Sequence, residues 1–113
     1  MSVLESGKIS IWYNSIEVRS MTEIRKDGNR FIYVDEDNHV LAEITFVYIT
    51  NQKIDVNHTF VSPILRGKGI GKRLVEAVID FARQEGLKIM PTCSYVKQVF
   101  ETSSQYQDVY YQS

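Results

Sequence analysis

The spacing of hydrophobic residues changes from every second to every fourth position near residue 65, and this change most constrains the fold. From residue 40 to 61 the chain is rich in β-formers that alternate with polar residues, which predicts strands. From residue 70 the apolar side chains recur every fourth position, as Ile70, Leu74, Val78 and Ala82. This second pattern predicts an amphipathic helix that ends at Gly86, a residue suited to a helix C-cap.

Three predicted strands precede that helix and one follows it. The first three cover residues 31–34, 40–50 and 53–61 and are separated by turn-forming residues, so we expect an antiparallel meander. Strict alternation would give each of the two longer strands one apolar face. These faces consist of Ile44, Phe46 and Tyr48 in the first and of Ile54, Val56, His58 and Phe60 in the second. Pro63 should end the third strand. A short buried strand at 87–90 and a second helix at 94–101 complete an α+β fold.

The composition fits one globular domain that covers residues 1–113. Hydrophobic residues make up 43% and charged residues 24% of the 113 residues. The first 25 residues have no clear pattern beyond a strand-like stretch at 9–13. A net charge of −1 gives no reason to expect nucleic acid or an anionic membrane as a partner, and no stretch is long and apolar enough to span a bilayer. The one cysteine cannot form an intramolecular disulfide, so we expect a reducing, cytoplasmic location.

The segment that leads into the first predicted helix combines glycines with basic residues. No acidic residue lies between Asp55 and Glu76, whereas four basic ones fall within eight positions: Arg66, Lys68, Lys72 and Arg73. Cations in the first turn of a helix are unfavourable unless an anion binds there. Gly67, Gly69 and Gly71 would let the backbone N–H groups approach phosphate oxygens. The alternative is that the glycines only make the start of the helix flexible and that the basic side chains are solvated, with no ligand bound.

Two common phosphate motifs do not fit this segment. A dinucleotide fingerprint would need a glycine at Lys72 or Leu74, and a Walker loop would need glycine at Arg66 and Ser or Thr at Arg73. The segment Arg66-Gly67-Lys68-Gly69-Ile70-Gly71 resembles the pyrophosphate loop R/Q-x-x-G-x-G/A of the GNAT acetyltransferase superfamily. The preceding Val61-Ser62-Pro63 and the following Leu74 are also similar to that pattern. Cys93-Ser94-Tyr95-Val96 looks like a segment of a small, truncated, cysteine-containing branch.

The resemblance implies a GNAT-like mixed sheet with a central glycine-loop helix, and acetyl-CoA or CoA as the ligand. Main-chain groups of Phe60, Val61 and Ser62 would hold the pantetheine arm. The pyrophosphate would lie on the loop and on the start of the helix, contacting Arg66, Gly67, Lys68, Gly69, Ile70, Gly71 and Lys72. Ser94 and Lys97 would lie near the cofactor, although Lys97 equally fits a solvated position. No metal site is expected.

The chain also departs from a full-length member of the superfamily. Too little sequence precedes the meander for the usual early helices, and too little follows the second helix for a complete terminal hairpin. We therefore expect the acceptor side to be open or to be completed by another molecule. The sequence does not indicate an oligomeric state.

Two residues are candidates for the chemistry. His58 lies on the strand before the glycine loop, where relatives often carry a glutamate, and its imidazole suits a general base; a hydrogen-bonded core histidine is the alternative. Cys93 precedes the second predicted helix, and a thiol at a helix N-terminus can become a nucleophile; a small buried hydrophobe is the alternative. A general acid would come from one of several tyrosines: Tyr95, Tyr106, Tyr110 and Tyr111.

The sequence thus predicts an N-acetyltransferase that transfers acetyl from acetyl-CoA to an unidentified amine. A non-catalytic acetyl-CoA-binding or sensing module is a second hypothesis, because the expected carboxylate is missing. An interaction domain that recruits a partner through its tyrosine-rich tail is a third.

Overall fold

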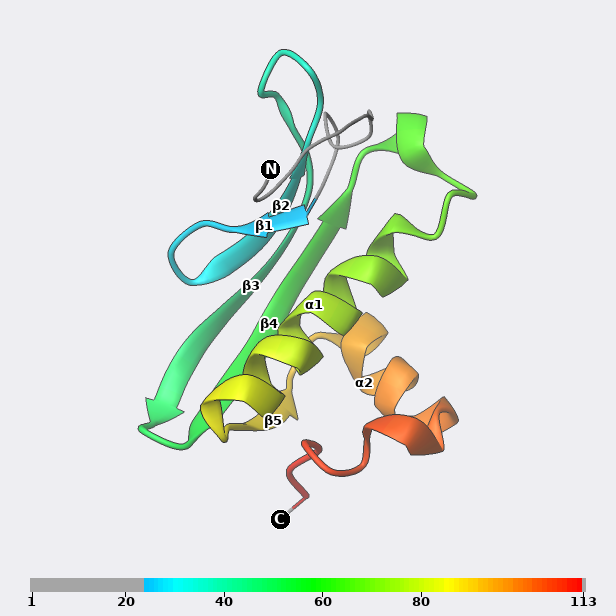
Figure 1. Ribbon diagram of the computed structural model, residues 1–113. Helices are drawn as coiled ribbons and strands as arrows, with labels where there is room; N and C mark the ends of the chain where they lie inside the picture. Colours follow the sequence, from blue (N-terminus) through cyan, green and yellow to red (C-terminus); the bar gives the residue numbers. More distant parts are fainter. Residues whose placement is uncertain (1–23, 113) are drawn as a thin grey trace, which may run out of the picture.

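The protein is built on a five-stranded sheet with both helices packed beside it (Figure 1), as seen in a computed structural model that describes residues 24–112. The strands lie in the order β1 (Ile24–Lys26), β2 (Arg30–Val34), β3 (Val40–Thr50), β4 (Lys53–Val61) and β5 (Lys88–Pro91). The first four pair antiparallel, and β5 pairs parallel to β4. The predicted meander and α+β class are confirmed. The strand-like stretch at 9–13 lies outside the described residues.

Helix α1 (Ile70–Glu85) connects β4 to β5 after a short 3-10 turn, η2 (Pro63–Leu65). It ends at Gly86, whose left-handed φ of 69° forms the predicted C-cap. Helix α2 (Ser94–Thr102) follows β5, and η3 (Ser104–Tyr106) begins the C-terminal segment. No helix within residues 24–112 is long and apolar enough to cross a membrane.

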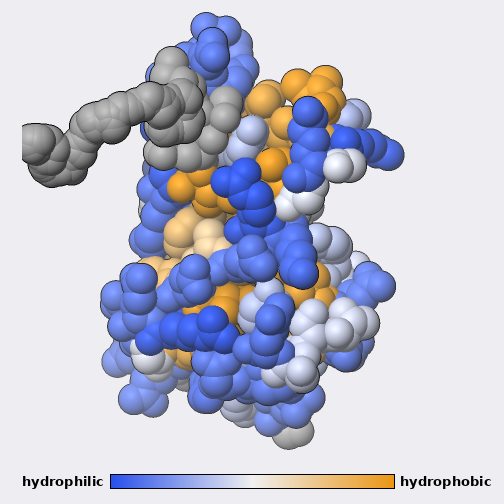
Figure 2. All heavy atoms as spheres, turned by 45° about the vertical axis from the view of Figure 1, so that its right-hand side comes forward, coloured by the Kyte–Doolittle hydropathy of each residue, from blue (hydrophilic) through white to orange (hydrophobic). Residues whose placement is uncertain are grey.

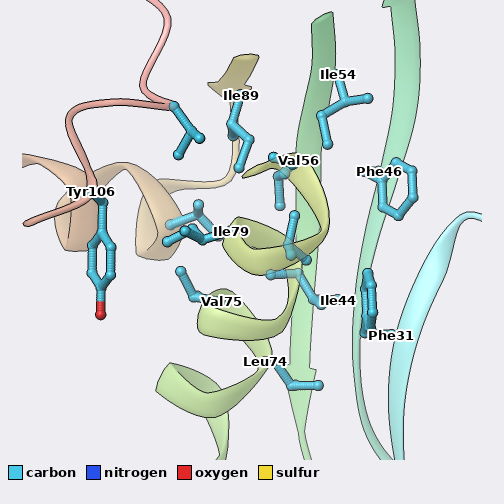
Figure 3. Packing of buried hydrophobic residues seen from close by; sticks show 14 of the residues in the cluster. Phe31, Ile44, Phe46, Ile54, Val56, Leu74, Val75, Ile79, Ile89 and Tyr106 are labelled. Carbon is cyan, nitrogen blue, oxygen red and sulfur yellow. The ribbon is translucent and has the colours of Figure 1, made fainter. Parts of the chain in front are cut away.

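The core lies between one face of the sheet and the apolar stripe of α1 (Figure 3). All four residues that defined the predicted helical period are buried, namely Ile70, Leu74, Val78 and Ala82. Phe31 and Phe46 from the sheet meet Phe81 of α1, with ring centroids 5.9 and 5.5 Å from it. The sheet and α1 therefore form one packed unit, so the start of α1 is held in a fixed position beside the end of β4.

One residue in β4 overturns the predicted alternation. Thr45 pairs with His58 whereas Phe46 pairs with Val56, so Asn57 is skipped in the backbone register with β3 and forms a bulge. An extra residue moves every later side chain to the opposite face. Val56 is fully buried, but Phe60 is 45% exposed. The expectation that His58 and Phe60 share the buried face of Ile54 and Val56 is therefore wrong.

The bulge turns Thr59 and Val61 toward the side of the sheet that carries the helices, where both line a groove. On β3, Ile44 and Phe46 are buried as predicted, whereas Tyr48 on the same face is 49% exposed near the strand end.

Strands β4 and β5 separate beyond Val56. Their pairing ends at Val56 and Pro91, and the backbone N–H groups of Thr92 and Cys93 both donate to the carbonyl of Val56 at 3.1 Å. Asp55 also holds the two segments together where the strands separate. Its Oδ1 accepts hydrogen bonds from the backbone N–H and the hydroxyl of Thr92, at 3.2 and 2.8 Å. Within the described residues, β4 then continues to Val61 with no strand on its β5 side.

The C-terminal segment packs back on the domain. Tyr110 stacks on Phe100 with ring centroids 4.7 Å apart, and the buried Tyr106 donates to Glu76 at 3.0 Å. Lys53 lies over the ring of Tyr111. These three tyrosines support the fold, which leaves Tyr95 as the tyrosine nearest the glycine loop.

Candidate functional site

The start of α1 lacks the side-chain cap that most helices have. Gly69 occupies the N-cap position with a left-handed φ of 71°, and no side chain accepts from the first turn. Within residues 24–112, no acceptor pairs with the N–H groups of Gly67, Gly69, Ile70, Gly71 or Lys72. The first helical hydrogen bond of α1 runs from Arg73 to the carbonyl of Gly69. The loop therefore presents a set of backbone donors to an incoming acceptor.

The three loop glycines differ in what surrounds them. A Cβ added at Gly67 or Gly69 would meet nothing within 4 Å, and both residues have φ values that other amino acids adopt at a cost, 81° and 71°. A Cβ at Gly71 would instead lie 3.0 Å from the hydroxyl of Tyr95. Gly67 and Gly69 thus leave open space in front of the backbone, whereas Gly71 makes room for a side chain of α2.

A groove of about 310 Å³ runs along this loop between the end of β4 and α2. Its lining residues are Thr59, Val61, Leu65, Arg66, Gly67, Gly69, Ile70, Gly71, Lys72 and Tyr95. Figure 2 shows hydrophobic residues exposed on this side of the molecule and bordered by hydrophilic ones. An apolar floor beside backbone donors and two cations fits a ligand that has a long neutral arm and a phosphate group.

Seven of the predicted cofactor residues line the groove, namely Val61, Arg66, Gly67, Gly69, Ile70, Gly71 and Lys72. The other five do not: Phe60, Ser62, Lys68, Ser94 and Lys97. Phe60 points to the opposite face because of the bulge, and the N–H of Ser62 already donates to Leu41 at 2.7 Å. Three lining residues were not predicted as cofactor contacts: Thr59, Leu65 and Tyr95. The sequence indicates Tyr95 as one of four possible acids and not as a cofactor contact, although its position two residues after Cys93 places it in the first turn of α2.

The electrostatics of the loop also fit an anion. The first turn of α1 contains Lys72 and Arg73 and no acidic residue. Within the described residues, neither of these nor Arg66 or Lys68 forms an ion pair. The partial positive charge of the helix N-terminus adds to these cations. The backbone donors, the open space at two glycines and the cations together fit a pyrophosphate.

Cys93 occupies the N-cap position of α2, where its Sγ lies 3.5 Å from the hydroxyl of Thr59. It does not line the groove itself, but Thr59 and Tyr95 on either side of it do. Burial, the largest single influence, opposes ionisation of the thiol. The hydroxyl of Thr59 and the nearby N–H groups of Val96, Tyr95 and Thr59 favour the thiolate enough to outweigh burial and lower the pKa of Cys93, although the thiol forms no side-chain cap hydrogen bond with α2.

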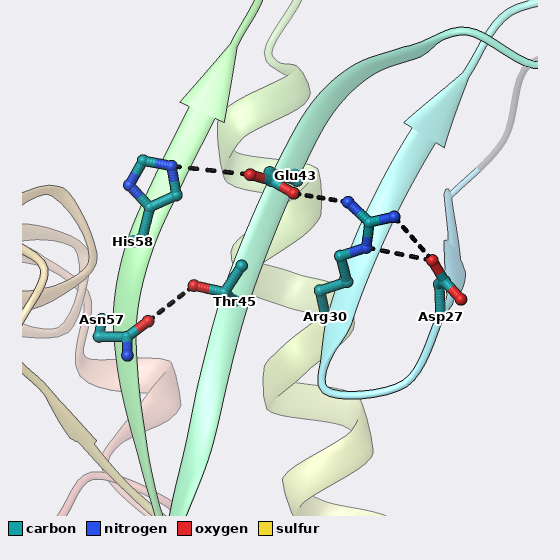
Figure 4. Close-up of polar contacts among 6 residues, drawn as sticks. All are labelled: Asp27, Arg30, Glu43, Thr45, Asn57 and His58. Atoms are coloured by element: carbon teal, nitrogen blue, oxygen red, sulfur yellow. Dashed lines mark hydrogen bonds and ion pairs between the residues drawn. The ribbon is translucent and has the colours of Figure 1, made fainter.

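His58 lies on the outer face of the sheet, with its Nε2 3.7 Å from a carboxylate oxygen of Glu43 on β3 (Figure 4). The other oxygen of Glu43 accepts from Arg30 at 2.8 Å, and Arg30 also pairs with Asp27. The structure therefore supplies a carboxylate beside His58 that was not predicted. The signal for it is weak: Glu43 occupies an outward position between the buried Ala42 and Ile44, as an ordinary solvated residue would.

The structure does not bring His58 and Cys93 together. Thr59, which contacts Cys93, follows His58 directly in β4, and successive strand residues point to opposite faces. His58 therefore cannot take a proton from Cys93 in this geometry. The two candidates belong to different faces of the site.

Comparison with known proteins places this arrangement in a family. A family model described as GCN5-related N-acetyl-transferase matches residues 30–109. Protein NATD1 from Danio rerio is 32% identical over 82 residues, which cover 73% of this chain and 74% of that protein. Protein NATD1 from Xenopus tropicalis is 37% identical over 59 residues, which cover 52% of this chain and 54% of that protein. The chain thus spans about half the length of several of the relatives that it matches.

Solved structures agree with the sequence matches. A GCN5-like protein from Staphylococcus aureus is 42% identical and superposes with a TM-score of 0.70, covering 84% of this chain and 93% of that one. N-acetylglutamate synthase from Neisseria gonorrhoeae, solved with coenzyme A and N-acetyl-glutamate, is 17% identical with a TM-score of 0.53. This similarity covers 71% of this chain and 22% of that one and shows a shared fold alone. With a family match that extends over most of the chain, this protein belongs to the GCN5-related N-acetyltransferase family.

Proposed function

We propose that this protein binds acetyl-CoA in the groove at the start of α1 and transfers the acetyl group to an amine. The observation that carries the proposal is the uncapped N-terminus of α1, where Gly67 and Gly69 leave the backbone donors open to a phosphate. Family membership supports the same chemistry.

Different residues of the groove would contact different parts of acetyl-CoA. The N–H groups from Gly67 to Lys72, together with the side chains of Arg66 and Lys72, would hold the pyrophosphate. The edge of β4 beyond Val56 would hold the pantetheine arm through main-chain groups, with Thr59 and Val61 beneath it. When bound, acetyl-CoA supplies a thioester whose acyl carbon is open to attack.

The transfer needs a group that accepts a proton from the attacking amine. The amine nitrogen bonds to the acyl carbon, the C–S bond breaks, and the CoA thiolate takes a proton from solvent and leaves as its thiol. His58 is the proposed base, and Glu43 beside it would stabilise the imidazolium that forms. An acceptor that reaches His58 must come from the outer face of the sheet, opposite α1.

Cys93 offers a second route to the same products. Its sulfur would take the acetyl group while its proton leaves with CoA, and the amine would then attack the new thioester. The lowered pKa of Cys93 and its place between two residues of the groove support this route. Because His58 lies on the other face, this route does not use it to activate the thiol.

A non-catalytic acetyl-CoA-binding module is the second candidate function. One observation favours it: within the described residues, no acidic or imidazole side chain lines the groove. Such a module would bind the ligand through the same loop and would not release CoA when amines are added.

Calorimetry with acetyl-CoA, followed by a CoA-release assay over a panel of amines, tests these proposals. Binding with turnover supports the transferase, binding without turnover supports the module, and no binding refutes both. His58→Gln should lower the rate of transfer and leave the affinity for CoA nearly unchanged. His39→Gln is the matched control, because His39 is the other histidine of the chain and lies exposed in the β2–β3 turn. Equal rates in the two variants would remove His58 from the mechanism.

A further inference from the structure

We infer that Tyr95 is a cofactor-binding residue whose hydroxyl donates a hydrogen bond to the phosphate of the bound CoA. This inference rests on the proposed function, since it assigns a further residue to the same site. It adds a side chain from α2 to a phosphate site that is otherwise built from the loop and α1.

Tyr95 lies against Gly71 at the start of α1. A Cβ at Gly71 would lie 3.0 Å from the hydroxyl oxygen of Tyr95 and 3.3 Å from the ring carbon that bears it. The phenol thus lies directly over the first turn of α1. A methyl group at position 71 would require the phenol to shift by a few tenths of an ångström, so glycine there suits the position of Tyr95 as well as a bound ligand.

The hydroxyl of Tyr95 lies beside Gly71, one of the residues whose N–H groups are free in the described part of the chain. Tyr95 lines the groove together with Gly69, Gly71 and Lys72, and it is 39% exposed. Its hydroxyl has no hydrogen-bond partner among residues 24–112. Burial, and then the neighbouring Cys93, raise the pKa of the phenol, so it stays protonated at neutral pH and can act as a donor. A neutral donor beside the helix N-terminus is suited to an anionic oxygen.

Tyr95 also connects the phosphate site to Cys93. The two residues lie in the same turn at the start of α2, with Cys93 at the N-cap and Tyr95 in the first turn. A phosphate bound to the phenol would therefore hold the end of α2 that carries the thiol.

The test compares Tyr95→Phe with the parent on two probes, CoA and pantetheine. Pantetheine has the same thiol arm but no phosphate. The variant should bind CoA roughly tenfold more weakly, as expected for a lost hydrogen bond to a charged group. Its affinity for pantetheine, followed by NMR titration, should not change. Unchanged CoA affinity, or an equal loss for both probes, would overturn the assignment to phosphate.

A second measurement tests the contact with Gly71. Gly71→Ala alone should weaken CoA binding, because the new methyl group displaces the phenol. In a Tyr95→Ala background the same change should have a much smaller effect, which a double-mutant cycle detects. Melting temperatures show whether each variant is folded. Equal effects of Gly71→Ala in both backgrounds would contradict the proposed contact.

Tyr48→Phe is the matched control, because Tyr48 is an exposed tyrosine near the far end of β3. It should bind both probes as the parent does. The CoA measurements on the parent and on Tyr95→Phe test the proposed function and the role of Tyr95 separately. If the parent itself does not bind CoA, the proposed function is wrong. If the parent binds CoA and Tyr95→Phe binds it equally well, the inference about Tyr95 alone is wrong.

Discussion

Gly69, like Gly67, is a loop residue at which both the backbone conformation and the space in front of it matter. Its φ of 71° would cost another residue about 1 kcal/mol of stability, and its Cβ would extend into the open space of the groove. We predict that Gly69→Ala lowers the melting temperature slightly and weakens CoA binding more than tenfold. The bulkier Gly69→Val should have a larger effect on both. Calorimetry and thermal unfolding measure the two effects separately.

Gly28 provides the matched control for this prediction. It has a similar left-handed φ of 60° and open space around it, but it lies in the turn between β1 and β2. Gly28→Ala should therefore lower stability by a similar amount and leave CoA binding unchanged. If both alanine variants bound CoA equally well, the loop would not be the phosphate site.

Cys93 can be tested through its ionisation. Because its pKa is lowered, a larger fraction of the thiol is ionised at neutral pH than in a short peptide. We predict that iodoacetamide labels Cys93 faster than a peptide thiol at pH 7. The midpoint of the labelling rate against pH should also lie below that of the peptide. CoA should slow the labelling by covering the groove. A midpoint at or above that of the peptide would contradict the role of Thr59 and of the α2 N–H groups.

Mass spectrometry extends the test of Cys93 to the acetyl group. Incubation with acetyl-CoA should add one acetyl group to the protein, and mild hydroxylamine should remove it, as expected for a thioester. Cys93→Ala and Cys93→Ser should both bind CoA and carry no hydroxylamine-sensitive group. Turnover that persists in Cys93→Ala would show that the amine attacks acetyl-CoA directly.

At the scale of elements, the position of β4 could be predicted from the sequence, but the faces of its last residues could not. Alternation located the strand and its end near Pro63, and the four-residue period located α1 and its cap at Gly86, because these patterns are local. The bulge at Asn57 does not follow from any local sequence pattern. It depends on how β4 pairs with β3, so the faces of His58 and Phe60 were assigned wrongly.

The same distinction explains which parts of the site were predicted. The glycine loop is contiguous in sequence, so its residues could be recognised together. Glu43 and Tyr95 come from β3 and α2, and only the register of the sheet and the packing of α2 on α1 bring them to His58 and Gly71. A single sequence contains no record of such contacts.

Asp55 ties β4 to the segment after β5 and thereby positions Cys93. Its carboxylate accepts two hydrogen bonds from Thr92, the residue before Cys93. We predict that Asp55→Ala lowers the stability by about 1 kcal/mol, the usual scale for such bonds, and slows the labelling of Cys93. Thermal unfolding and iodoacetamide kinetics measure these effects.

Asp37→Ala is the control for Asp55, since Asp37 is exposed in the β2–β3 turn. It should leave the labelling rate unchanged. Normal labelling in Asp55→Ala would show that α2 holds Cys93 in position without the link to Asp55.

At the scale of the whole molecule, the charge is nearly balanced but unevenly placed. The net charge is −1, yet four cations fall between residues 66 and 73 with no acidic residue among them. The attraction of the protein for an anion is therefore local to one end of α1. Surface charges of this kind are screened by salt over about 10 Å at 0.1 M.

Ligand binding at that end should stabilise the entire fold by mass action. At a CoA concentration of one hundred times Kd the stabilisation is about 2.7 kcal/mol, which for a domain of this size raises Tm by roughly 10 °C. Because Arg66 lines the groove, we predict that Arg66→Glu removes most of this increase. We also expect added salt to reduce the increase in the parent more than in the variant. Thermal unfolding with and without CoA, at low and high salt, measures both effects.

Arg25→Glu makes the same change of charge on β1, which among the described strands lies at the opposite end of the sheet from β5. If net charge governed binding, Arg25→Glu and Arg66→Glu would reduce the CoA-dependent increase in Tm equally, because both shift the net charge by the same amount. If the local field at the start of α1 governs it, Arg25→Glu should retain nearly the whole increase, since β1 contributes no residue to the groove. Equal losses in the two variants would therefore contradict a phosphate site that depends on Arg66.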